Sequence, residues 1–81
     1  MRVKVRLFGR LHDLVGANER EFELPAGATV GDAWQALTRE APGIAPYARS
    51  VSAAVNADFS KMAAALSDGD EVAFLPPVSG G

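Results

Sequence analysis

Apolar and charged residues alternate along two stretches near the start of the chain, residues 2 to 8 and residues 19 to 24. A period of two predicts a β-strand with one face buried and the other face in water. The side chains expected on the buried faces are Val3, Val5, Leu7, Phe22 and Leu24. The exposed face of the first strand is then basic and that of the second is acidic, which predicts that the two strands pair.

Charge also predicts the register of this pair. Antiparallel pairing with Val5 opposite Phe22 sets basic side chains against acidic ones and apolar side chains against apolar ones. The other pairs in this register are Arg6 with Glu21, Lys4 with Glu23 and Val3 with Leu24. Exposed pairs of this kind contribute only about 0.2–1 kcal/mol each, so they select the register more than they stabilise the fold. An acidic neighbour therefore explains the basic stripe better than a ligand site does.

The period changes to that of a helix after Thr29. Thr29 and Asp32 fit a capping box, in which a side-chain oxygen accepts from a first-turn amide and an acid follows three residues later. The apolar residues that recur at helical spacing behind this cap are Val30, Ala33, Trp34 and Leu37. Pro42 and Gly43 mark the end of the helix. The apolar stripe predicts that the helix covers one face of the sheet, with Trp34 in the core.

Shorter segments complete the predicted architecture. Along the rest of the chain we expect a helical turn within residues 9–18, a loop at 41–50, a strand at 51–55, a turn at 67–70 and a last strand at 71–75. Residues 61 to 66 are ambiguous, because Met62 and three alanines favour a helical turn but the segment is too short to nucleate alone. The order predicts an α+β sheet covered on one face by one main helix, with a domain at 1–75 and an extended tail at 76–81.

An apolar surface is expected at the base of this tail. If Val72 and Phe74 face the helix, Leu75 faces outward, and Phe8 points outward by the same parity. Should the first and last strands be neighbours, Phe8, Leu75 and Pro76 would form an exposed apolar patch. Such patches often mark a surface that binds a partner.

Composition argues against several classes of function. The 81 residues carry a net charge of −2, which is not the basic character expected of a nucleic-acid binder. There is no cysteine, so a disulfide framework, a thiolate metal site and a cysteine nucleophile are excluded. His12 is the single histidine, and we expect no metal site. No signal-peptide pattern or membrane-spanning run is present, so we expect a cytoplasmic protein without a membrane partner.

The end of the sequence carries the candidate chemistry. Gly80 and Gly81 lack β-carbons, so they can thread a slot only as wide as a backbone and bring the carboxylate of Gly81 close to a nucleotide phosphate. Glycine is achiral, so its activated acyl carbon cannot racemise. The approach to these glycines, which we expect to guide the tail into a partner, consists of Pro76, Pro77, Val78 and Ser79. Fully extended, residues 76–81 span roughly 20 Å at about 3.3 Å each, enough to enter another protein's active site.

The last sixteen residues, Leu66 to Gly81, read Leu-Ser-Asp-Gly-Asp-Glu-Val-Ala-Phe-Leu-Pro-Pro-Val-Ser-Gly-Gly. This segment resembles the MoaD/ThiS family of sulfur carriers, in the branch of molybdopterin synthase small subunits. The opening Val-Lys-Val-Arg-Leu-Phe-Gly and the start of the helix at Thr29 share the resemblance. The resemblance implies a ubiquitin-like β-grasp fold. One departure is the segment between Phe59 and Leu66, where many relatives have a short polar link.

The resemblance also implies a mechanism and partners. An E1-like adenylating enzyme would convert Gly81 into an acyl-adenylate, and a sulfur donor would displace AMP to leave a thiocarboxylate. The acceptor would be the large subunit of molybdopterin synthase, which would supply the catalytic side chains. No cofactor would be bound permanently, and AMP and sulfur would be transient at Gly81. The chain would thus be a sulfur-carrying subunit more than an enzyme in its own right.

Two other functions fit the same residues. A carrier of sulfur for thiazole synthesis would share the fold and the final glycines, although the Phe-Leu-Pro-Pro-Val-Ser approach favours the molybdopterin branch. A ubiquitin-like modifier would use the same carboxylate to form isopeptide bonds. A ubiquitin-like binding module would share the fold, and its carboxylate would not react. The sequence leaves the sulfur donor and the oligomeric state open.

Overall fold

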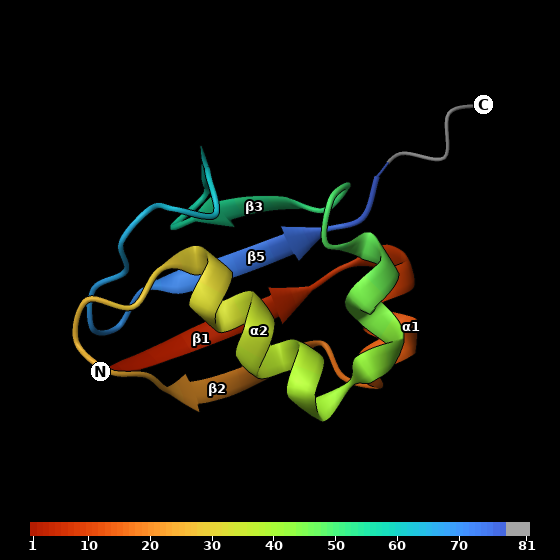
Figure 1. Ribbon diagram of the computed structural model, residues 1–81, viewed down its shortest axis with the longest axis horizontal. Coiled ribbons are helices and arrows are strands. Elements are labelled where there is room, and N and C mark those ends of the chain that lie inside the picture. Colours follow the sequence, from red (N-terminus) through yellow and green to blue (C-terminus); the bar gives the residue numbers. More distant parts are fainter. Residues whose placement is uncertain (78–81) are drawn as a thin grey trace.

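A single sheet with helices packed on one side forms the body of the protein (Figure 1). The computed structural model describes residues 1–77. Their elements are β1 (Arg2–Leu7), α1 (Gly9–Val15), β2 (Glu19–Glu23), α2 (Val30–Glu40), the 3₁₀ helix η1 (Pro42–Tyr47), β3 (Ser52–Val55), β4 (Asp58–Ser60) and β5 (Glu71–Leu75). The strand order across the sheet is β2-β1-β5-β3-β4. β1 and β5 run parallel and the other neighbours run antiparallel, so the predicted α+β fold is confirmed.

The core lies between the sheet and α2. Burial alternates along β1 and β5, as the period of two predicted, and the inward side chains are almost fully covered. The Trp34 and Phe74 rings meet edge to face, with centroids 5.0 Å apart and an angle of 68° between the rings. Residues that are fully buried include Val5, Leu11, Val30, Leu37, Ile44, Val72 and Phe74. Trp34 therefore belongs to the core, as predicted.

The start of α2 has the capping box that the sequence predicted. The Asp32 amide donates to Thr29 Oγ1 at 3.2 Å, and the Thr29 amide donates to Asp32 Oδ2 at 2.8 Å. These bonds satisfy two backbone donors that the helix itself leaves free. The helix thus begins where its local sequence dictates.

The register predicted for β1 and β2 is wrong by two residues. Val3, and not Val5, lies opposite Phe22, and Arg6 lies opposite Glu19. A slip of two residues keeps every side chain on its own face and still sets basic residues against acidic ones. Charge and burial therefore do not distinguish the two registers.

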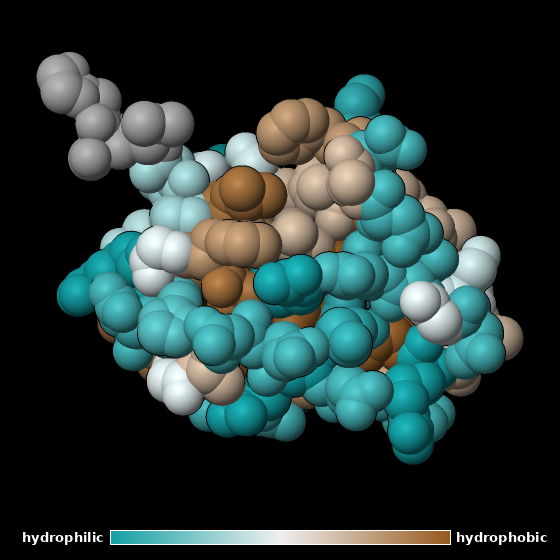
Figure 2. Space-filling view, turned by 180° about the vertical axis from the view of Figure 1, so that it is seen from behind, coloured by the Kyte–Doolittle hydropathy of each residue, from teal (hydrophilic) through white to brown (hydrophobic). Residues whose placement is uncertain are grey.

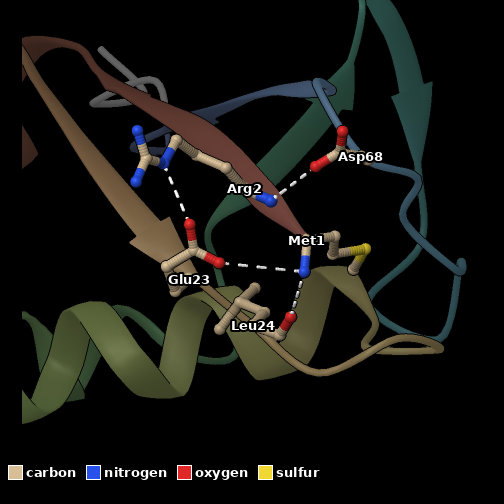
Figure 3. Close-up of polar contacts among 5 residues, drawn as sticks. All are labelled: Met1, Arg2, Glu23, Leu24 and Asp68. Atoms are coloured by element: carbon tan, nitrogen blue, oxygen red, sulfur yellow. Dashed lines mark hydrogen bonds and ion pairs between the residues drawn. The ribbon is translucent and has the colours of Figure 1, made fainter.

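The observed register gains contacts at the amino end of β1 (Figure 3). The Leu24 amide donates to the Met1 carbonyl at 2.8 Å, and the amino group of Met1 donates to the Leu24 carbonyl at 2.8 Å. Arg2 Nε donates to Glu23 Oε1 at 3.0 Å, and the Arg2 amide donates to Asp68 Oδ1 at 2.8 Å. These bonds hold the start of β1 between β2 and the turn before β5.

Residues 61–66 do not form the helical turn that their alanines favoured. The Met62 and Ala64 carbonyls instead accept from the Gly31 and Val30 amides, at 2.8 and 2.9 Å. Those amides belong to the first turn of α2 and have no partner within the helix. The segment makes a tight turn at Met62 and Ala63, closed by the bond from the Ala64 amide to the Lys61 carbonyl at 3.0 Å, and its carbonyls satisfy the start of α2.

Two further elements were not predicted. The loop expected at 41–50 contains η1, which buries Ile44 completely. β4 pairs with β3 through a turn in which two non-glycine residues, Asn56 and Ala57, have positive φ of 49° and 74°. The bounds of β5 agree with the sequence prediction, and β3 begins one residue later than predicted.

Candidate functional site

The centre of the sheet determines where the chain leaves the body. β1 and β5 are parallel neighbours, so they end at the same edge, beside α1 (Figure 1). Phe74 is fully buried, Leu75 and Pro76 are half-buried, and Pro77 is exposed. The chain therefore passes from core to solvent within four residues. The other predicted site residues, Val78, Ser79, Gly80 and Gly81, lie outside the described residues.

An apolar patch covers part of the sheet face opposite α2 (Figure 2). It surrounds a shallow depression of about 400 Å³ and consists of Phe8, Ala54, Phe59, Ala73 and Leu75. The strand register places Phe59, Ala54 and Ala73 in one row across β4, β3 and β5. Phe59 is 81% exposed and Phe8 is 40% exposed, so the first ring is largely available to a partner and the second is partly available.

This arrangement agrees in part with the sequence prediction. Phe8 and Leu75 line the same depression, because β1 and β5 are neighbours as that prediction required. Pro76, the third residue of the predicted patch, does not line it. Phe59 was not predicted as a site residue, although a lone aromatic between Asp58 and Ser60 was a signal that could have been used. Whether the apolar patch binds a partner stays a prediction.

Charged side chains occupy the other part of the same face. Arg6 forms an ion pair with Glu71 at 3.2 Å, and its guanidinium lies 5.7 Å from the centroid of the Phe8 ring. Lys4 pairs with Glu19 at 3.5 Å. The basic stripe of β1 is thus neutralised by acidic strands, as predicted, but β5 contributes one partner as well as β2. These exposed pairs contribute little to stability and frame the apolar patch.

Asp70 is the titratable group whose environment is most clearly altered in the described chain. Its carboxylate accepts from the Ser67 amide at 2.8 Å and from the Asn56 side-chain amide at 2.9 Å. The backbone bond from Ser67 and then the bond from Asn56 lower the pKa of Asp70 below its usual value. Both bonds close the turn before β5 and tie it to the β3–β4 turn, so the role of Asp70 is structural.

The described residues offer no metal centre. Among residues 1–77, no three side chains of the histidine, cysteine and acidic types lie close enough to hold an ion. His12 Nδ1 lies 3.3 Å from Asp13 Oδ1 at the surface of α1.

None of the described helices has both the length and the apolar character needed to cross a membrane.

A mixed sheet covered by one main helix, with a tail leaving from the central strand, defines a β-grasp protein of the ubiquitin-like class. The model of the ThiS family matches residues 5–81. The chain therefore belongs to the ThiS/MoaD family of sulfur carriers.

Relatives and solved structures agree with this assignment. A molybdopterin synthase sulfur carrier subunit from Chlamydomonas reinhardtii is 35% identical over 100% of both chains. The crystal structure of SAMP1 from Haloferax volcanii has a TM-score of 0.87 and 28% identity, and the match covers 100% of both chains. A chain in the protein–protein complex of subunits 1 and 2 of the molybdopterin-converting factor from Helicobacter pylori has a TM-score of 0.68, with 26% identity over 100% of both chains.

Proposed function

We propose that this chain carries sulfur for molybdopterin synthesis, as a thiocarboxylate on Gly81. The family match extends through residue 81, and the Chlamydomonas relative with that function aligns over its whole length. The observation that carries the proposal is the position of the apolar patch. It lies beside the end of β5, where Pro76 follows Leu75, so a partner that docks there is within reach of the tail.

Three chemical steps would load the sulfur. The carboxylate of Gly81 attacks the α-phosphate of ATP, which gives an acyl-adenylate and releases pyrophosphate. A sulfur donor of the persulfide class then attacks the acyl carbon and expels AMP. Reductive cleavage of the resulting acyl disulfide by a thiol leaves the thiocarboxylate. Glycine suits the first two steps, which take place at the carboxyl group, because it adds no side chain beside the acyl carbon.

Unloading would use the same terminus. The thiocarboxylate sulfur is larger and more polarizable than oxygen, and it attacks an electrophilic carbon of the pterin precursor, from which an oxygen substituent leaves as water. Hydrolysis of the acyl–sulfur bond leaves sulfur on the product and returns the carboxylate. The chain has no cysteine, so no side chain of its own competes for the sulfur. General acids, general bases and phosphate-binding cations would belong to the large subunit.

The apolar patch would dock both partners in turn. An activating enzyme and the large synthase subunit each need the tail to enter an active site, and one patch at its base can orient it for either. The Helicobacter relative is named as a complex of two subunits, which supports a heteromer. Phe8, Leu75 and Pro76 would provide contacts, and residues 77–79 would guide Gly80 and Gly81.

A second function is supported by the modifier relatives. Small archaeal modifier protein 1 of Haloferax volcanii has a TM-score of 0.84 with this chain. A modifier would use the same adenylate to form an isopeptide bond with a lysine. The body of the protein would serve either function, so the fold does not separate them.

Intact-mass measurement of the protein from its own cells tests the proposal. A carrier shows a fraction in which one oxygen is replaced by sulfur at the end of the chain, whereas a modifier shows conjugates to lysine. Gly81→Ala should keep the fold and suppress adenylation through the added methyl, and Ala26→Gly, at an exposed loop position, is the matched control. Wild-type sulfur transfer by Gly81→Ala would refute the proposed mechanism.

A further inference from the structure

Gly9 lies against the first residue of the tail. It follows Phe8 at the turn from β1 into α1, and its φ is +54°. Leu7 faces Phe74 in the parallel register, so Gly9, two residues further on, lies level with Pro76. A β-carbon added to Gly9 would lie 3.0 Å from Cγ and 3.7 Å from Cδ of Pro76. The proline ring thus occupies the space that any other side chain would fill.

This contact bears on the direction of the tail. Pro76 has a fixed φ, so the position of its ring constrains the path of the backbone that follows. We propose that Gly9 is a positioning residue that sets the direction in which the backbone leaves the body at Pro76 and Pro77. The inference rests on the proposed carrier function for its role in activity. The contact itself can be tested without that function.

The expected displacement follows from the contact distance. Carbon atoms pack at about 3.5–4.0 Å, so a methyl group on Gly9 would push Pro76 away by about 0.7 Å. If Pro76 moves by this distance about the Cα of the neighbouring residue, which lies about 3.8 Å away, the backbone rotates by about 10°. The backbone would then leave the body at Pro77 in a direction rotated by about 10°. Misplacement by about 1 Å can cost about 100-fold in rate, so the shift should be visible in adenylation.

Gly16 provides a matched control at the other end of α1. Its φ is +82°, and a β-carbon there would meet nothing within 4 Å. Gly16→Ala therefore places alanine in the same left-handed region as Gly9→Ala, without the contact to Pro76. The difference between the two variants isolates that contact from the strain of the backbone.

The kinetic experiment compares these variants with the adenylating enzyme, below the unfolding temperature of each. Gly9→Ala should lower kcat by at least about tenfold, and Gly16→Ala should change it by less than about twofold. With Pro76→Ala as the background, Gly9→Ala should have almost no further effect, because alanine lacks Cγ and Cδ. Equal rates for the two glycine variants, or an undiminished loss in the Pro76→Ala background, would overturn the inference.

A measurement on the wild-type protein keeps the inference testable if Gly9→Ala does not fold. Nuclear Overhauser effects should connect the α-protons of Gly9 with the γ-protons of Pro76, and their absence would overturn the inference. Failure of the proposed function looks different. In that case the wild-type chain is not adenylated at all, while the proton contact between Gly9 and Pro76 is still observed.

Discussion

Replacing Phe8 with alanine should weaken docking without unfolding the protein. Phe8 exposes 40% of its surface, and a phenylalanine offers roughly 200 Å², so a partner that covers it buries about 80 Å² there. At about 25 cal/mol per Å², the loss is about 2 kcal/mol. Such a loss corresponds to about a 30-fold increase in Kd.

Calorimetric titration with the large synthase subunit measures this change. Gln35→Ala, on the exposed face of α2 and away from the apolar patch, is the control and should leave Kd unchanged. Leu75→Glu places a charge within the patch and should weaken binding further, because a buried carboxylate would have no partner. Thermal unfolding shows that each variant is folded. A folded Phe8→Ala protein that binds like Gln35→Ala would refute the docking role.

Three further changes test how the body is built. The lowered pKa of Asp70 means that its contribution to stability is present above the unfolded value of about 3.9 and is lost as the pH falls through the lower folded value. Asp70→Asn should therefore show a shallower loss of unfolding free energy below about pH 4, and an unchanged slope in acid denaturation would contradict this reasoning. Ala57→Gly should stabilise the protein by up to about 1 kcal/mol, because alanine is strained at a φ of 74°; a lower urea midpoint would count against that strain. Thr29→Ala should cost about 1 kcal/mol through loss of the capping box, and an unchanged melting temperature would show that the cap contributes nothing.

Features encoded locally could be predicted from the sequence. The alternation in β1 and the capping box at Thr29 depend on neighbours within a few residues, and both are observed. The register of β1 with β2 could not be predicted, because two registers that differ by two residues share the same burial and charge pattern. The carbonyls of residues 61–66 bond to amide groups of α2, about thirty residues earlier, so the local helix propensity of this segment gave the wrong indication.

The candidate site was predictable to a similar extent. Parity along the strands placed Phe8 and Leu75 on the same face, once β1 and β5 were taken as neighbours. Phe59 was missed because the three-residue strand β4 is too short for a periodic signal. The approach of Gly9 to Pro76 depends on the parallel register and is invisible in a linear sequence.

The central place of β5 has a mechanical consequence. A force applied to the end of the chain by a bound enzyme would act along β5. Backbone hydrogen bonds to β1 and β3 hold that strand on both sides. Such a load acts in shear, so the hydrogen bonds on both sides must break together and cannot open one after another. The body should therefore tolerate repeated traction on its end without losing a strand.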